Sequence, residues 1–406
     1  MIQNIDLDFF IRSRVTKRSE SLLKQDLKLN HSLLEERLNG RSALVIGGAG
    51  TIGSFYIKAL LKFGIGRLVV VDINENGLTE LVRDLRSSEG YHIPNEFITY
   101  PMNFGDRVFE KMFRSVGPFD IMANFAAHKH VRSEKDIFSV EAMIENNVLR
   151  ARRLLDLLLE SPPQHFFCVS TDKAANPVNI MGASKKLMEE LIMAYSGKLK
   201  ITTARFANVA FSNGSLPLGF IERLAKGQPW SCPLGIRRFF VSPQESGELC
   251  LLASVLGESG DIIFPKLDEE RDMISFEAIA LDLLEFLGLE ADVCATEEEA
   301  RQKALLLNES STSYPVYFFE TDTSGEKPYE EFYTSGEVID NDRFINLGVI
   351  KNAVRRDFRE IDSIFSRLRT LFDSGNVTKT GVVEILHEWL PNFEHIEKGK
   401  GLDSKM

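Results

Sequence analysis

The chain has 406 residues and a formal net charge of −11, with 44% hydrophobic and 26% charged residues. This length allows two domains or one large domain with extensions, and the apolar content is ample for a core. The negative charge argues against a broad nucleic-acid or anionic-membrane surface, because such surfaces need clustered lysine and arginine.

The cysteines and the N-terminus bear on the compartment. The four cysteines are widely separated and form no C-x-x-C pair, which favours free thiols in a reducing compartment over disulfides or a zinc site. No apolar run approaches the roughly 20 residues of a membrane helix, and the N-terminus lacks the apolar block of a signal peptide. We expect a cytoplasmic protein with no membrane insertion and no bound metal.

Residues 1–40 are polar, with leucines at helical spacing, and we expect a helical extension used for packing or oligomerisation. From residue 41 to 207, short apolar runs alternate with helical patterns. These runs are continuous rather than alternating, as in strands covered on both faces. The pattern predicts an α/β fold with a doubly wound parallel sheet. The expected strands are 43–46, 68–71, 97–100, 120–125, 165–170 and 201–206.

After residue 207 the strand-helix alternation becomes less regular. Proline and glycine become frequent, so residues 208–350 are expected to form mostly a smaller, substrate-binding lobe over the carboxyl edge of the sheet. Within this range, residues 291–312 are polar and predict a surface helix or insertion. Apolar residues at helical spacing then predict a helical extension over 351–406.

A glycine loop lies between the first expected strand and a helix. Gly47, Gly50 and Gly53 form a G-x-x-G-x-x-G pattern, and Asp72 ends the next strand 19 residues beyond Gly53. Such a loop lets the backbone approach a pyrophosphate, while a carboxylate at this spacing meets the adenosine ribose. The core at 41–207 is therefore expected to bind NAD. NADP is less favoured, because Asp72 would repel a 2′-phosphate.

Three polar side chains follow the fifth expected strand: Thr171, Asp172 and Lys173. Ligands bind at the carboxyl edge of an open α/β sheet, so a hydroxyl, a carboxyl and an amine would face the nicotinamide. They would form a compact acid–base set.

The runs Val169–Pro177 and Met181–Lys185 resemble the UDP-N-acetylglucosamine 4,6-dehydratase branch of the extended short-chain dehydrogenases. With the shorter stretches that share it, the resemblance spans roughly residues 40–350 in the family's order. These stretches are Ala126–Val131, Asn146–Leu149, Arg205–Val209, Arg237–Phe240 and Gly325–Glu331. The resemblance implies a Rossmann-type core and a lyase of surface-polysaccharide or glycan biosynthesis.

Two positions depart from the family's pattern. Met181 stands where most of the superfamily has a catalytic tyrosine, and a thioether is neither an acid nor a base. Asn103 stands where an aspartate usually binds adenine, and its amide would serve instead. The loss of the tyrosine would fit a decayed site, but some members of the resembled branch carry methionine there and are regarded as active.

The resemblance also implies roles for single residues. Lys173, with a pKa lowered by desolvation, would remove the C5 proton of the sugar, and Asp172 would protonate the departing C6 hydroxyl. Thr171 would hydrogen-bond the C4 oxygen. The expected cofactor contacts are Gly47, Gly50, Thr51, Ile52, Gly53, Asp72, Asn103, Ala126 and Lys185. Lys185 would hold the nicotinamide ribose and is also expected to be catalytic, through its positive potential. The expected substrate contacts are Lys129, His130, Asn208 and Arg238.

Several alternatives stay open on the sequence. The nucleotide of the substrate is UDP, GDP or another, the preferred hexosamine is open, and configuration at C5 is retained or inverted. A 4-epimerase or a decarboxylase on the same fold would use the tyrosine that this chain lacks. A non-catalytic NAD-binding scaffold would use the terminal extensions for interactions. By resemblance, the chain is expected to form a homo-oligomer through helices of the core.

Overall fold

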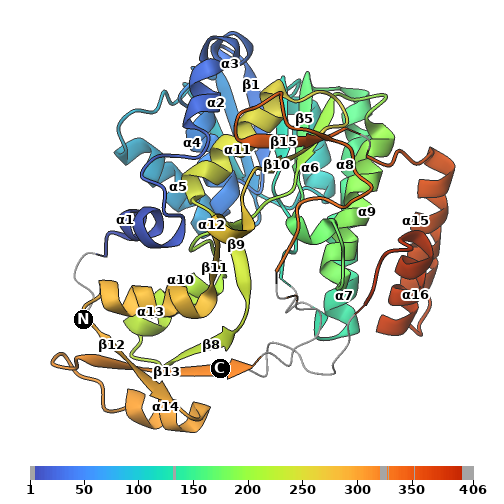
Figure 1. The fold of residues 1–406 in the computed structure, drawn as a ribbon. Helices are drawn as coiled ribbons and strands as arrows, with labels where there is room; N and C mark the ends of the chain where they lie inside the picture. The colour runs from blue at the N-terminus through green and yellow to red at the C-terminus, as the bar shows by residue number, and fades with distance from the viewer. Residues whose placement is uncertain (1–4, 131–133, 321–326, 328, 352, 396–406) are drawn as a thin grey trace.

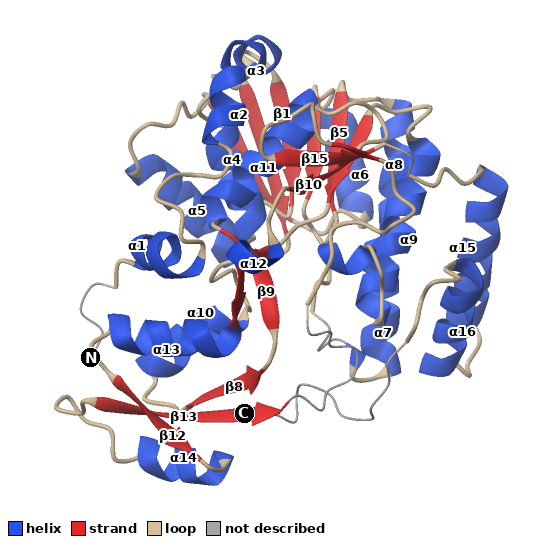
Figure 2. Cartoon of the chain, in the orientation of Figure 1, coloured by secondary structure: helices blue, strands red, loops and turns tan. Residues whose placement is uncertain are grey.

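The computed structural model describes residues 5–130, 134–320, 327, 329–351 and 353–395. A nine-stranded sheet with helices on both faces forms the larger part of the molecule (Figure 1, Figure 2). Its strands lie in the order β14 (Ile339–Asp340), β15 (Leu347–Ile350), β10 (Ile262–Pro265), β6 (Ile201–Ala204), β5 (His165–Val169), β4 (Ile121–Asn124), β1 (Ser42–Ile46), β2 (Arg67–Asp72) and β3 (Glu96–Pro101).

From β3 to β10 all neighbouring strands are parallel, and β15 and β14 continue the sheet in antiparallel pairs. The order β3-β2-β1-β4-β5-β6 is that of a Rossmann-type doubly wound sheet. The predicted fold class is confirmed. The order in which successive strands are added reverses between β1 and β4, although the two strands are parallel. At this switch point the carboxyl ends of the strands border a crevice, where such sheets bind ligands.

Helices cover both faces of the sheet, which explains why the apolar runs in its strands are continuous. One face packs against α3 (His31–Leu38), α4 (Thr51–Leu60), α5 (Glu75–Ser87) and α11 (Pro243–Leu256). The other packs against α6 (Arg107–Val116), α7 (Ile137–Ile144), α8 (Arg150–Glu160) and α9 (Ile180–Tyr195). The helical stretch expected at 139–159 is present, interrupted by a π-helical turn, η3 (Glu145–Leu149).

A smaller lobe lies beyond the carboxyl edge of the sheet (Figure 2). Its first sheet has the order β11 (Met273–Ser275), β9 (Arg237–Val241) and β7 (Asn208–Val209). Its second has the order β12 (Glu290–Cys294), β13 (Ser313–Glu320) and β8 (Trp230–Leu234). The helices of this region are α10 (Leu216–Ala225), α12 (Glu269–Asp272), α13 (Phe276–Phe286) and α14 (Glu297–Ala304). Within 208–350, the elements α11, β10, β14 and β15 belong to the large sheet and its cover, so the chain crosses between the two parts more than once.

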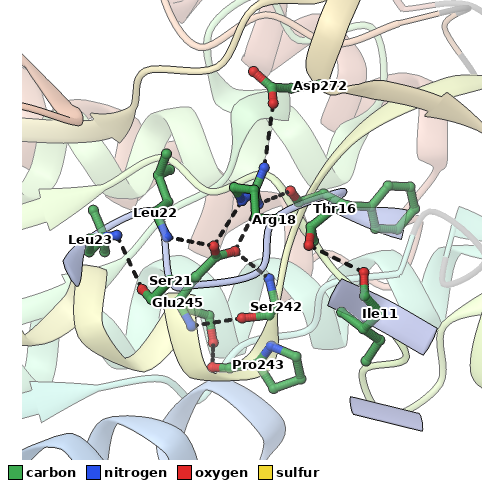
Figure 3. A network of polar contacts seen from close by, with 12 residues as sticks. Ile11, Thr16, Arg18, Ser21, Leu22, Leu23, Ser242, Pro243, Glu245 and Asp272 are labelled. Carbon is green, nitrogen blue, oxygen red and sulfur yellow. Dashed lines mark hydrogen bonds and ion pairs between the residues drawn. The ribbon is translucent and has the colours of Figure 1, made fainter. Parts of the chain in front are cut away.

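The N-terminal segment packs along both parts. It contains α1 (Leu7–Phe10), η1 (Ile11–Val15), α2 (Lys24–Leu29) and α3. Phe10 is buried in the apolar core of the lobe, and Leu34 is buried in the core on one face of the large sheet. Between them, Arg18 places Nη2 2.8 Å from Glu245 at the start of α11 and Nη1 3.5 Å from Asp272 of α12 (Figure 3).

The C-terminal helices α15 (Phe358–Phe372) and α16 (Lys379–Trp389) form a hairpin outside α8 and α9 (Figure 1). Buried Glu190 of α9 accepts hydrogen bonds from Arg356 Nε at 2.6 Å and from the Trp389 indole at 2.8 Å. Arg152 of α8 lies over the rings of Tyr195 and Phe358. Among the described residues, no helix is both long and apolar enough to span a bilayer.

Candidate active site

The loop between β1 and α4 has the shape needed by a backbone that closely approaches a ligand. Gly47 has a φ of +76°, and a Cβ there would lie 2.6 Å from the backbone nitrogen of Ala126. A Cβ on Gly53 would lie 2.3 Å from the Gly47 carbonyl oxygen. The N-cap of α4 is Gly50, so no side chain caps the first N–H groups of this helix. Uncapped N–H groups at a helix N-terminus suit a pyrophosphate.

Asp72 at the end of β2 and Asn103 just after β3 lie at the same carboxyl edge of the sheet as the glycine loop. Asp72 accepts hydrogen bonds from the backbone N–H groups of Ala49 and Asn74, each at 2.9 Å. Its carboxylate therefore lies against the glycine loop, as a ribose-binding acidic residue must. The Asn103 side-chain oxygen accepts the N–H of Gly105 at 2.8 Å, and the side chain is half-buried. These residues fit the adenosine half of a dinucleotide.

A cavity of about 650 Å³ lies between the carboxyl edge of the sheet and the lobe. This volume suits a small-molecule or cofactor site. The predicted site residues that line it are Ile52, Lys129, His130, Thr171, Lys173, Met181, Lys185, Asn208 and Arg238. Those outside its lining are Gly47, Gly50, Thr51, Gly53, Asp72, Asn103, Ala126 and Asp172. Across the described ranges, no group of three or more His, Cys, Asp or Glu side chains is placed to hold a metal ion.

The Thr-Asp-Lys run begins a short helical turn, η4 (Asp172–Ala174), directly after β5. One oxygen of buried Asp172 accepts hydrogen bonds from the Thr171 hydroxyl at 2.9 Å and from the Lys173 ammonium at 3.1 Å. The Lys173 backbone N–H donates to the same oxygen at 2.9 Å. Across the cavity wall, Glu330 Oε1 lies 3.7 Å from Lys173 Nζ. The ammonium group is thus held between two buried carboxyls.

The expected pKa of Lys173 was wrong in direction. Burial alone would lower the pKa of this lysine, but the charges of Asp172 and Glu330 outweigh burial and raise the pKa above its ordinary value. Burial, together with the nearby charge of Asp172, raises the pKa of Glu330 above its ordinary value despite the opposing charge of Lys173. The surroundings therefore favour the ammonium form of Lys173, and they make Glu330 easier to protonate than an ordinary glutamate.

Met181 lies at the start of α9 and lines the cavity. Its backbone N–H donates to Oε1 of buried Glu134 at 2.8 Å. The other oxygen of Glu134 lies 3.8 Å from His395 Nε2, so the segment after α16 reaches this corner of the site. Lys185 donates to the Val169 carbonyl at 2.6 Å, and burial lowers its pKa.

Sequence reasoning gave no individual role to Glu330, Glu134 and Asn147. Asn147 lies in η3, where its oxygen accepts the His128 N–H at 2.9 Å and its amide donates to the Ser184 hydroxyl at 3.1 Å. The π-helical turn directs the Asn147 amide toward the loop that contains His128. Turns of this kind are frequent at functional sites. The stretch Asn146–Leu149, which shares the resemblance, was the available signal for Asn147. Glu330 lies in the stretch Gly325–Glu331 that shares the resemblance, which gave it no role of its own. Glu134 had no signal, because it is close to the site only in space.

Of the predicted substrate residues, Asn208 of β7 and Arg238 of β9 line the cavity from the lobe, and Lys129 and His130 line it from the loop after β4. Lys129 Nζ donates to the Asn213 carbonyl at 3.0 Å, and the N–H of Asn213 donates to the Thr51 hydroxyl at 3.0 Å. Arg238 is buried and donates to the Lys327 carbonyl at 3.0 Å. The remaining positions quoted for the resemblance, Val131, Gly325, Glu326 and Pro328, lie outside the described residues.

Residues 43–351 match the family described as polysaccharide biosynthesis protein. The chain belongs to this family. One protein similar to this chain comes from Methanocaldococcus jannaschii and is called an uncharacterised membrane protein. It is 33% identical, over 60% of this chain and 72% of its own length. The probable polysaccharide biosynthesis protein EpsC of Bacillus subtilis is 27% identical over 80% of this chain. The chain spans 50% of the length of EpsC. A UDP-glucose 4-epimerase of Rickettsia conorii is 30% identical over 56% of this chain and 66% of its own.

Solved structures share the fold of this family member at low identity. Pen from Bacillus thuringiensis aligns with a TM-score of 0.61 at 19% identity, over 79% of this chain and 90% of its own. The dTDP-glucose 4,6-dehydratase DesIV from Streptomyces venezuelae, with NAD and TYD bound, aligns with a TM-score of 0.54 at 18% identity. This alignment covers 84% of this chain and 99% of DesIV. These likenesses establish the Rossmann-type fold.

Proposed function

We propose that the chain is an NAD-dependent nucleotide-sugar 4,6-dehydratase, a lyase that makes a 4-keto-6-deoxy sugar for surface-polysaccharide or glycan biosynthesis. The observation that carries the proposal is the cavity wall. There Thr171 and Lys173, both hydrogen-bonded to Asp172, share one space with Met181. An elimination at C5 and C6 needs an acid and a base, which this set supplies without a tyrosine.

NAD is the proposed cofactor, with NADP disfavoured by Asp72. The glycine loop and the uncapped N-terminus of α4 would hold the pyrophosphate, with Thr51 and Ile52 in its first turn. Asp72 would bind the adenosine ribose, Asn103 the adenine, and Lys185 the nicotinamide ribose, near Ala126. When bound between these residues, NAD would supply reversible hydride transfer, from C4 of the sugar and back to C6.

The proton steps are assigned to the chain's own side chains. Thr171 would bind the C4 oxygen and pass the C4 hydroxyl proton to Asp172, to which its hydroxyl already donates at 2.9 Å. Asp172 would then give that proton to the C6 hydroxyl, which leaves as water. Lys173, as the free amine, would take the C5 proton after the C4 ketone has acidified it. The resulting ammonium, whose hydrogens exchange with solvent, would give a proton back to C5 at the end of the cycle. Net proton transfer over the cycle is zero.

The substrate is proposed to be a nucleotide-linked N-acetylhexosamine, with the UDP-linked N-acetylglucosamine first and the GDP-linked sugar second. Arg238 and Asn208 line the cavity on the lobe side and would bind the diphosphate. An arginine fork pairs well with phosphate oxygens. Lys129 and His130 would lie near the sugar and the nicotinamide. A homo-oligomer is proposed from the family resemblance, and light scattering of the purified chain tests it.

The test is turnover of UDP-N-acetylglucosamine, and separately of the GDP-linked sugar, in deuterated water with NAD, followed by mass spectrometry and NMR. The expected product has lost one water and carries one deuterium at C5, and its configuration at C5 tells retention from inversion. A product isomeric with the substrate would contradict the proposal and favour the 4-epimerase. Tight NAD binding without turnover of either sugar would favour the non-catalytic scaffold.

A further inference from the structure

Glu330 has no role in the proton steps above, yet it lies in the wall of the same cavity. Its side chain is 5% exposed, and its Oε1 is 3.7 Å from Nζ of Lys173. The Lys173 ammonium also donates to Asp172 at 3.1 Å. A buried carboxylate costs free energy unless it is paired, so a second one beside the same lysine calls for a reason.

The charges around this lysine create a chemical problem for the proposed mechanism. Lys173 removes a C5 proton only as the free amine, whereas Asp172 and Glu330 favour its ammonium form and raise its pKa. Some group must therefore take the ammonium proton before the C5 step. Asp172 is already committed to the proton that moves from the C4 to the C6 hydroxyl.

Glu330 meets the requirements for that group. Its own surroundings favour the neutral acid, because burial and the charge of Asp172 raise its pKa, while the cations Lys173, Arg238 and Lys327 oppose this. A sugar that fills the cavity expels water and strengthens the penalty on both charges of the Lys173–Glu330 pair. Exchanging the ion pair for a neutral amine and a neutral acid keeps the net charge of the site constant.

We propose that Glu330 is the proton partner of Lys173: it accepts the ammonium proton and so generates the free amine that acts at C5. This inference rests on the proposed dehydratase function. An N–H bond of Lys173 breaks and an O–H bond forms on Glu330. The amine then takes the C5 proton, and the C–H electron pair moves into the enolate of the C4 ketone. After hydride has reached C6, the Lys173 ammonium, whose hydrogens exchange with solvent, gives a proton to C5, and Glu330 returns its proton to Lys173.

The first arm of the test compares wild type with Glu330→Gln and Glu330→Asp in the full chain with NAD. Glu331→Gln is the matched control, because Glu331 is the adjacent carboxylate and bonds to the Asn176 side chain at 2.7 Å, not to Lys173. Glu330→Gln should lower C5 deuterium exchange by about 100-fold or more, the usual size of a general-base effect. The 4-keto sugar that precedes elimination, trapped with borodeuteride, should accumulate in this variant.

Residual activity of Glu330→Gln should rise with pH, because solvent must now deprotonate Lys173, and Glu330→Asp should restore part of the exchange. A merely structural role would slow oxidation at C4 and exchange at C5 equally. That equal loss would overturn the inference, and so would wild-type exchange in Glu330→Gln.

The second arm does not depend on turnover. Infrared difference spectra are recorded on binding UDP-N-acetylglucosamine with NADH in place of NAD, so that C4 is not oxidised and Asp172 gains no proton from the sugar. They should show a protonated carboxyl band in wild type and in Glu331→Gln, and none in Glu330→Gln. Absence of the band from wild type would overturn the inference even if dehydration is observed. If the band behaves as expected but no dehydration occurs, the result supports proton transfer to Glu330 and contradicts the proposed dehydratase function.

Discussion

Replacing Arg205 by methionine should cost this protein a large part of its stability, because the guanidinium holds two carboxylates inside the core. Arg205 is fully buried and donates two hydrogen bonds to Glu189, two to Glu337 and one to the Phe332 carbonyl. The Glu189 side chain is 1% exposed and that of Glu337 is 12% exposed. Removing one partner of a buried ion pair costs about 3–5 kcal/mol, because the other charge is left unpaired.

The pH dependence of this loss follows from the pKa of Glu189. Burial would raise that pKa, but the charge of Arg205 outweighs burial and holds the pKa below its ordinary value of 4.5. In wild type the ion pair therefore stabilises the fold above that ordinary value, and this contribution is lost as the pH falls through the lower, folded pKa. In Arg205→Met burial is no longer offset by the guanidinium, so the carboxyl takes up a proton at higher pH and the deficit shrinks toward acid.

Equilibrium urea unfolding of wild type and Arg205→Met, followed by circular dichroism at several pH values, measures the difference. The double variant Arg205→Met with Glu189→Gln should recover part of the loss, because it removes one of the two unpaired charges. A deficit below about 1 kcal/mol near neutral pH would refute the reasoning, since exposed ion pairs already give that much. A deficit that does not change between about pH 5 and pH 8 would refute the assignment to Glu189.

Three further outcomes are expected. Asp72→Ala should weaken NAD binding in calorimetry by about tenfold or more, because the ribose loses a charged acceptor, and should weaken NADP binding less; equal losses would contradict this role. Met181→Leu should keep kcat within about threefold, since neither side chain titrates and their volumes are similar; a large loss would give the thioether a chemical role. Glu190→Gln should lower the free energy of unfolding by about 1–3 kcal/mol through its bonds to Arg356 and Trp389, with kcat unchanged. Thermal unfolding without a shift would contradict the packing of the C-terminal hairpin.

The core of the fold was predictable because its signals are local. The apolar runs that became β1 and β2, the glycines between β1 and α4, and the position of Asp72 all lie within about one β-α-β unit, whose geometry is set over short sequence distances. The Thr171–Lys173 run was likewise placed correctly at the end of β5, because a strand delivers the residues that follow it to the edge of its sheet.

The electrostatics of the site were not predictable in the same way. The pKa of Lys173 is raised by the adjacent Asp172 first and then by Glu330, which is 157 residues away in the chain and lies near Lys173 only in the folded structure. Desolvation of a lysine in a crevice was foreseeable, but the balance of burial against the charge of Asp172 was not, and neither was the second carboxylate, Glu330, so the predicted direction of the pKa shift was wrong. The contact between His395 and Glu134 has the same origin, because it depends on how the C-terminal hairpin packs.

The N-terminal segment has a consequence for how ligands enter the crevice. It is buried in the lobe through Phe10 and against the sheet through Leu34, and Arg18 between them contacts both α11 and α12. A rigid-body swing of the lobe would have to break these contacts together. We therefore expect the two walls of the crevice to keep their spacing when the substrate arrives, with access governed by loop motions. Binding to such a preorganised crevice should lose little of its favourable free energy to rearrangement of the protein.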